Sequence, residues 1–262
     1  MDITNKNIDG GKPFDWGRTS ADYARFRDIY PEKFYRSITA SGLCVKGQRV
    51  LDIGTGTGVL PRNMYKYGAR WTGSDISENQ ILQARRLTEE AGMDIEYVVS
   101  PAEELPFEEG SFDVITACQC YWYFDHARTA REFSRLLNKG GCAVFLMMDW
   151  LPFEDELARS SEELVLKYNP DWSGAGETFH KIEMPAEYEE YFTLQDSFAY
   201  RLNVRFSRES WTGRLRACRG IGASLSPEKT AEWEQEHLKM LEAYPEEFDI
   251  LHFAALAVFE KK

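Results

Sequence analysis

The chain has 262 residues, with 31 Lys and Arg against 43 Asp and Glu, and a formal net charge of −12 at pH 7. With 43% apolar and 28% charged residues, it has the composition of a globular protein with a sizeable core rather than a disordered one. The acidic balance argues against nucleic acid or an anionic membrane surface as the main partner. No apolar run exceeds seven residues, as in Cys142–Met148, far short of the ~20 that span a bilayer.

The start of the chain and its cysteines bear on compartment and metal binding. The polar N-terminal residues lack the apolar stretch of a signal peptide. Five cysteines, an odd number without a CxxC pair, favour a reduced cytoplasmic protein. Cys118 and Cys120 lie two residues apart, but with no second cysteine pair and no HxxxH nearby we expect no metal site. None of these features indicates the oligomeric state.

Hydrophobic periodicity and turn residues predict the elements in chain order. Residues 20–42 have helical periodicity with a break at Pro31. Strands and helices then alternate, with Ser77 as the cap of one helix and Lys139-Gly140-Gly141 as the end of another. The predicted strands are 50–53, 69–74, 95–99, 112–117, 142–148, 192–206 and 250–259, and the predicted helices are 60–67, 78–91, 126–138, 209–218 and 227–243. Up to residue 149 this alternation predicts an α/β fold, a parallel sheet with helices on both faces, which binds ligands at the carboxyl ends of its strands.

The most informative stretch is the glycine-rich turn from Asp52 to Gly58, which reads DIGTGTG. Glycines there allow a tight turn and close approach of a ligand, although a plain strand–helix turn is the simpler alternative. The spacing is not the GxGxxG of dinucleotide-binding loops, and no GxxxxGK[ST] is present. No phosphate-binding lysine directly follows the glycines, so we expect an uncharged part of the ligand at this loop. Asp75, at the end of the second strand, has the spacing at which a carboxylate accepts both hydroxyls of a ribose.

Residues 48–149 resemble the class I S-adenosylmethionine-dependent methyltransferases. DIGTGTG looks like their first motif and GSDIS like their acidic second-strand motif, and SPAEELPFEEGSFDVITACQCYWYF and LLNKGGCAVFLM look like the segments that follow. The resemblance implies a Rossmann-like, doubly wound, seven-stranded sheet with a reversed last strand, plus a small helical cap. It also implies an N-terminal capping segment (1–47), a core that binds S-adenosyl-L-methionine (48–149), an inserted lid (150–190) and C-terminal strands and helices that complete the sheet (191–262).

The same resemblance assigns cofactor contacts to particular residues. The glycine-rich turn would pass under the methionine part of the cofactor, Asp52 would hold the turn or the cofactor's amino group, and Asp75 would bind the ribose. The remaining contacts would come from Ile76, Ala102 and Glu103 around the adenine, and from Cys118 and Gln119 beside the methionine. The residues implied in the turn itself are Gly54, Thr55, Gly56 and Gly58.

Tyr23 and Arg27 lie one helical turn apart on one face of a segment that resembles the capping segment of the family. There they would reach the cofactor's carboxylate or cover the site, because the planar fork of an arginine suits a carboxylate. The alternative is a core tyrosine and a solvated arginine.

Candidate acceptor-binding residues lie in two places. Trp122 and Tyr123 follow the fourth strand and would form an apolar wall or simply pack in the core, while His126 is either a base or a helix cap. The segment 201–219 holds six arginines against the single acid Glu209. Either these pair with the chain's many carboxylates, or some of them, Arg216 and Arg219 first, bind an anionic substrate.

Methyl transfer is an in-line displacement that depends mainly on alignment and exclusion of water, so the lack of an obvious catalytic dyad does not argue against it. The sequence therefore predicts a methyltransferase that uses S-adenosyl-L-methionine and acts on a small, anionic or aromatic molecule. Methylation of RNA or protein, and cofactor binding without methyl transfer, are the alternatives.

Overall fold

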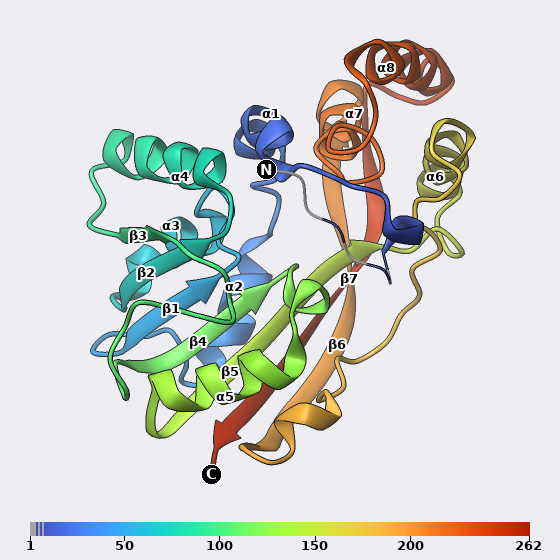
Figure 1. Cartoon of the computed structure of the whole chain (residues 1–262). Coiled ribbons are helices and arrows are strands. Elements are labelled where there is room, and N and C mark those ends of the chain that lie inside the picture. Colours follow the sequence, from blue (N-terminus) through green and yellow to red (C-terminus); the bar gives the residue numbers. More distant parts are fainter. Residues whose placement is uncertain (1–3, 5, 7) are drawn as a thin grey trace. The chain divides into compact units, whose positions relative to one another are not determined.

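The computed structural model describes residues 4, 6 and 8–262. Its strands form one seven-stranded sheet in the order β3-β2-β1-β4-β5-β7-β6 (Figure 1). The strands are β1 (Arg49–Ile53), β2 (Arg70–Asp75), β3 (Glu96–Val99), β4 (Phe112–Cys118), β5 (Leu137–Trp150), β6 (Phe192–Ser207) and β7 (Glu247–Lys261). The first five strands are parallel, and Figure 1 shows β7 running in the opposite direction to β5. The predicted Rossmann-like sheet with a reversed last strand is confirmed.

Eight α-helices connect or flank these strands in the described part of the chain. They are α1 (Ser20–Phe26), α2 (Glu32–Ala40), α3 (Val59–Met64), α4 (Glu78–Glu90), α5 (His126–Leu136), α6 (Glu156–Tyr168), α7 (Arg208–Arg216) and α8 (Pro227–Leu241). In Figure 1, α5 lies in front of the sheet and α2 behind it, so helices cover both faces. None of the described helices is long and apolar enough to cross a membrane.

α4 begins at Glu78 after Ser77, as predicted, but the predicted cap bond and the predicted end of α5 differ in the structure. Ser77 occupies the N-cap position of α4, but its side chain makes no capping bond; instead its backbone N–H donates to Asp75 Oδ1 at 2.8 Å. α5 ends at Leu136, two residues before the predicted end, and the Lys139-Gly140-Gly141 turn lies inside β5. There the register against β4 shifts between Phe112 and Val114, so the glycines accommodate an irregularity of a strand rather than end a helix.

One helix was not anticipated. α6 lies within the segment 150–190, where Asp155 caps it by accepting a hydrogen bond from the backbone N–H of Ala158 at 2.9 Å. An aspartate before an amphipathic run is a helix-start signal, and it was present in the sequence.

The chain divides into two compact units. Unit 1 comprises residues 1–29, 149–179 and 201–253, and unit 2 comprises residues 30–148, 180–200 and 254–262. Unit 2 holds β1 to β4 and most of β5, and its core is built from their buried side chains, such as Val50, Leu51 and Ile115. Unit 1 holds α1, α6, α7 and α8, around the buried Trp211 and Trp233.

Within unit 1, α1 and α7 pack closely at Gly213. A Cβ atom placed there would lie 2.4 Å from the ring of Phe26. Arg25 and Arg216 both lie over the same ring, with guanidinium carbons 4.8 and 5.8 Å from its centroid. The missing side chain of Gly213 is therefore what allows this contact between the two helices.

We expect Gly213→Ala to destabilise the protein by about 1–3 kcal/mol, because overpacking against the Phe26 ring outweighs the better helix propensity of alanine. Denaturant unfolding would measure the loss. In a Phe26→Leu background the same substitution should cost clearly less, because the smaller side chain leaves room. An equal cost in both backgrounds would contradict the steric explanation.

Candidate functional site

The glycine-rich turn lies between β1 and α3, at the carboxyl end of β1. Gly54, Gly56 and Gly58 all have positive φ, at 61°, 57° and 74°, a backbone conformation that side chains rarely adopt. A Cβ at Gly54 would lie 2.7 Å from Cys120 Sγ, and one at Gly58 would lie 2.4 Å from the Tyr97 hydroxyl. Conformation and close packing together therefore require glycine at these two positions.

Asp75, at the end of β2, fixes the same turn. Its Oδ2 accepts a hydrogen bond from the backbone N–H of Gly56 at 2.9 Å, and its Oδ1 accepts one from Ser77 at 2.8 Å. Burial raises the pKa of Asp75, against the lowering effect of these two bonds. The residue as a whole is only half-buried.

Asp52 lies one strand away, in β1, and is 2% exposed. Parallel pairing sets Asp52 opposite Thr116 of β4, whose hydroxyl donates to Asp52 Oδ1 at 2.6 Å. Burial raises the pKa of Asp52 to about 7, opposed by the hydrogen bond from Thr116, and the nearby Asp75 raises it further. Asp52 is thus poised between its charged and neutral forms near neutral pH.

The predicted residues after β4 are held by backbone contacts. Gln119 has φ 62°, which is uncommon for a residue other than glycine, and its side-chain amide donates to the carbonyl of Met148. Cys118 Sγ contacts the Tyr30 hydroxyl at 3.6 Å, and Cys120 Sγ donates to the carbonyl of Ile53 at 3.1 Å. The turn after β4 is thereby fastened to the end of β1.

The predicted adenine contacts differ in exposure. Ile76 is 39% exposed just past β2, and Ala102 is 8% exposed after β3. Glu103 Oε1 accepts a hydrogen bond from the backbone N–H of Asp125 at 3.0 Å, so this carboxylate helps hold the start of α5.

The aromatic segment after β4 forms a short 3₁₀-helix, Tyr121–Tyr123, and none of its residues is fully buried. Tyr121 stacks on Phe145 with centroids 4.9 Å apart, and Trp122 packs against Tyr121 at 5.1 Å. Partial exposure of Trp122 and Tyr123 is compatible with a wall that faces a ligand.

His126 is the first residue of α5 and does not cap it, because the side chain of Asp125 accepts the bond from Arg128 N. Burial lowers the pKa of His126, so the ring is neutral near pH 7. Its buried Nδ1 has no hydrogen-bond partner among the described residues.

Tyr23 and Arg27 belong to unit 1, whereas the glycine-rich turn belongs to unit 2. Arg27 Nη2 donates to the Tyr23 hydroxyl at 3.1 Å, and its guanidinium carbon lies 4.8 Å from the centroid of the Tyr23 ring. Arg27 is 9% exposed, so it is not the solvated arginine of the alternative. Their assignment to the cofactor stays a prediction.

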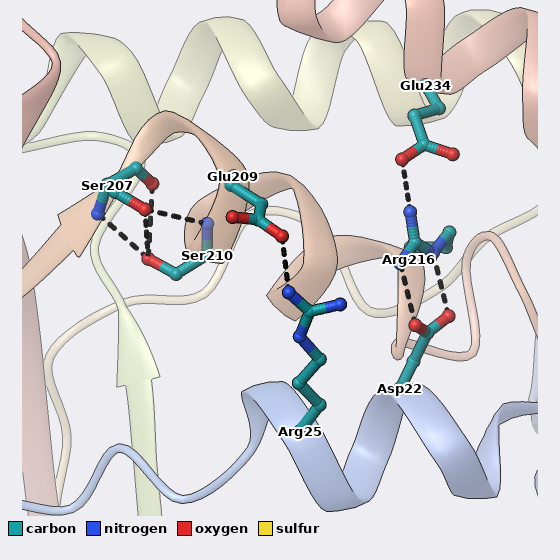
Figure 2. Close-up of polar contacts among 7 residues, drawn as sticks. All are labelled: Asp22, Arg25, Ser207, Glu209, Ser210, Arg216 and Glu234. Carbon is teal, nitrogen blue, oxygen red and sulfur yellow. Dashed lines mark hydrogen bonds and ion pairs between the residues drawn. The ribbon is translucent and has the colours of Figure 1, made fainter.

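Arg216 and Arg219, predicted to bind an anionic substrate, pair with carboxylates of unit 1. Figure 2 shows Arg216 between Asp22, which it meets through two bonds of 2.6 and 2.7 Å, and Glu234. Arg219 forms a buried ion pair with Asp9. These contacts are those of the alternative, in which the arginines pair with the chain's own acids.

Three residues that contact the glycine-rich turn or Asp52 are not predicted as site residues from the sequence. Thr116 holds Asp52, Cys120 closes on Gly54, and the Tyr97 hydroxyl lies against Gly58 and bonds Thr88 Oγ1 at 2.9 Å. Each comes from a strand other than β1 or from the turn after one. Only the strand register, which no local sequence pattern shows, brings them to the glycines.

Comparison with known proteins finds similarity to methyltransferases in both a family profile and individual relatives. The profile of a family described as "Methyltransferase domain" matches residues 51–145. A ubiquinone biosynthesis O-methyltransferase of Bordetella bronchiseptica is 32% identical over 139 residues, which are 52% of this chain and 58% of that protein. The chain thus spans somewhat over half the length of that relative.

A protein of the same name from Pseudomonas aeruginosa is 34% identical over 174 residues, covering 66% of this chain and 73% of that protein. Among solved structures, one from Bacillus halodurans aligns with a TM-score of 0.53 at 19% identity, covering 87% of this chain and 98% of that one. At that identity, the structural match bears on the fold alone.

The raised pKa of Asp52 predicts a pH-dependent stability. The folded protein holds a proton on Asp52 up to about pH 7, while the unfolded chain loses it near pH 4, so the folded state binds more protons in between. The free energy of unfolding should therefore fall by up to about 4 kcal/mol as pH rises through this window, at 1.36 kcal/mol per unit of pKa.

Urea unfolding of wild-type protein and Asp52→Asn across this pH range would measure the effect. The variant should lack this part of the decline, because asparagine does not titrate. Thr116→Val should shift the decline to higher pH, because it removes a bond that lowers the pKa. An unchanged slope in Asp52→Asn would assign the pH dependence to other groups.

Proposed function

This chain belongs to the class I S-adenosylmethionine-dependent methyltransferases, and we propose that it transfers the methyl group of S-adenosyl-L-methionine to a small-molecule acceptor. The single observation that carries the proposal is the glycine-rich turn held by Asp75 at the carboxyl ends of β1 and β2.

The residues of unit 2 fit this cofactor. The Asp75 carboxylate has capacity for further donors beyond Gly56 and Ser77, as a ribose diol requires. The exposed Ile76 offers an apolar face for an adenine. The hydroxyl of Thr57 is buried and has no hydrogen-bond partner among the described residues, which leaves it available to a bound group.

The bound cofactor would supply an activated methyl group on a sulfonium. The chain's own residues then need to hold the acceptor in line and exclude water, for which Trp122 and Tyr123 are candidate walls. His126, neutral near pH 7 and with a free Nδ1 among the described groups, is the candidate to take a proton from an acceptor hydroxyl.

A small-molecule acceptor is supported by two observations. Two relatives that match over 72% and 73% of their own length are named ubiquinone biosynthesis O-methyltransferase. The net charge of −12 disfavours RNA. Methylation of RNA or protein is the competing activity.

The test is formation of S-adenosylhomocysteine by the purified chain with S-adenosyl-L-methionine and, separately, a small-molecule extract, total RNA and total protein. We expect product with the small-molecule fraction and a methylated metabolite in its mass spectrum. Product with RNA or protein alone would overturn the small-molecule assignment, and no product with any fraction would overturn methyl transfer.

Asp75→Ala should raise the dissociation constant for S-adenosylhomocysteine at least ~10-fold, because the charge-assisted bonds to the turn and to the ribose are lost. Isothermal titration calorimetry would measure it. Asp94→Ala, in an exposed loop of unit 2, is the matched control and should bind as the wild type does. Equal binding by both variants would remove Asp75 from the site.

A further inference from the structure

One arginine of the 201–219 segment differs from the others. Arg201, Arg205, Arg208, Arg216 and Arg219 each form an ion pair with a carboxylate. Arg214, in α7, forms none with any residue that the structure describes, yet it is only 2% exposed. The most buried of the six arginines is thus the one whose charge no acid directly balances.

The contacts of Arg214 leave donors unused. Its Nη1 donates to Cys218 Sγ at 2.7 Å, and its guanidinium carbon lies 4.9 Å from the centroid of the Trp150 ring. Its Nε is buried and has no acceptor among the described residues. Among the described residues the thiol is the only hydrogen-bond partner of this buried guanidinium, which is costly, so the geometry calls for an acceptor that those residues do not provide.

The surroundings form a fixed, polar site in unit 1. Trp150 Nε1 donates to Glu162 Oε1 at 2.5 Å, which holds the ring on which Arg214 lies. Asp149, the neighbour of Trp150 in β5, is half-buried. Burial is the largest effect on its carboxyl group and raises the pKa to about 6. The positive charge of Arg214 lowers this pKa, Glu177 raises it, and the Trp150 backbone N–H and Arg27 lower it. Arg214 thus lies against a buried aromatic ring and is attracted by a half-buried carboxylate of the same unit.

We propose that Arg214 binds a carboxylate of the methyl acceptor, in a site of unit 1 formed with Trp150 and Asp149. Two parallel N–H···O bonds from the guanidinium would satisfy the unused donors, and the Trp150 ring would hold the plane of the fork. Asp149 attracts Arg214 from beyond ion-pair distance, so it orients the guanidinium without occupying its donors. This inference rests on the proposed function and names its substrate class: a small molecule that carries a carboxylate.

Benzoate is a suitable probe, with benzamide as its uncharged match. Thermal unfolding of the full chain, saturated with S-adenosylhomocysteine, would be followed while each compound is titrated. We expect benzoate, and not benzamide, to raise the melting temperature of wild-type protein. In Arg214→Gln the apparent dissociation constant for benzoate should rise roughly 10- to 100-fold. Arg205→Gln, which removes an exposed ion-paired arginine, should bind as the wild type does.

Benzoate stabilisation that is absent from the wild type, or equal in wild type and Arg214→Gln, would overturn the proposal. If Arg214→Gln does not unfold cooperatively, Arg214→Lys replaces it; it keeps the charge without the fork, so weakened benzoate binding supports the proposal and unchanged binding overturns it. Calorimetric measurement of S-adenosylhomocysteine binding distinguishes failure of the proposed function from failure of the role of Arg214. If wild-type protein does not bind S-adenosylhomocysteine, the proposed function is contradicted. If it binds S-adenosylhomocysteine but does not prefer benzoate to benzamide, only the role of Arg214 is contradicted.

Discussion

The parallel pairing of β1 with β2 on one side and with β4 on the other is the constraint on which the candidate site depends. It sets Asp52 opposite Thr116, and it ends β1 beside Asp75 and Cys120. The glycine-rich turn is then held by one carboxylate, through Gly56, and enclosed by one thiol, against Gly54. A turn fixed in this way is preorganised, so little ordering is left to oppose ligand binding.

This arrangement costs stability within unit 2. Asp52 is buried with a hydroxyl, rather than a cation, as its hydrogen-bond donor, and Gln119 adopts a left-handed conformation that few residues other than glycine tolerate. Such features concentrate at ligand sites, where the surrounding sheet holds them in place. The rest of unit 2, built from fully buried aliphatic strands such as Val50 and Leu51, offsets this cost.

The arginines of unit 1 differ in burial and, as a result, in the partners of their guanidinium groups. Arg205 is exposed and pairs with Glu247, Arg216 joins α7 to Asp22 and Glu234, and Arg214 is enclosed without a carboxylate partner in the described chain. Because α7 is a helix, residues two apart point in different directions. Arg214 and Arg216 therefore reach different surroundings although they are only two residues apart in the sequence.

The sequence by itself determined the alternation of strands and helices, the glycine-rich turn and Asp75, because hydrophobic periodicity and glycine spacing are local properties of the chain. It misplaced the end of α5, because Gly140 and Gly141 suit a strand irregularity as well as a helix end. Only the tertiary structure decided that Thr116, Cys120 and Tyr97 surround the turn. It also decided that Arg216 and Arg219 are paired with carboxylates, whereas Arg214 has no carboxylate partner among the described residues. Strand register and burial depend on contacts between residues far apart in the chain, and no local pattern records them.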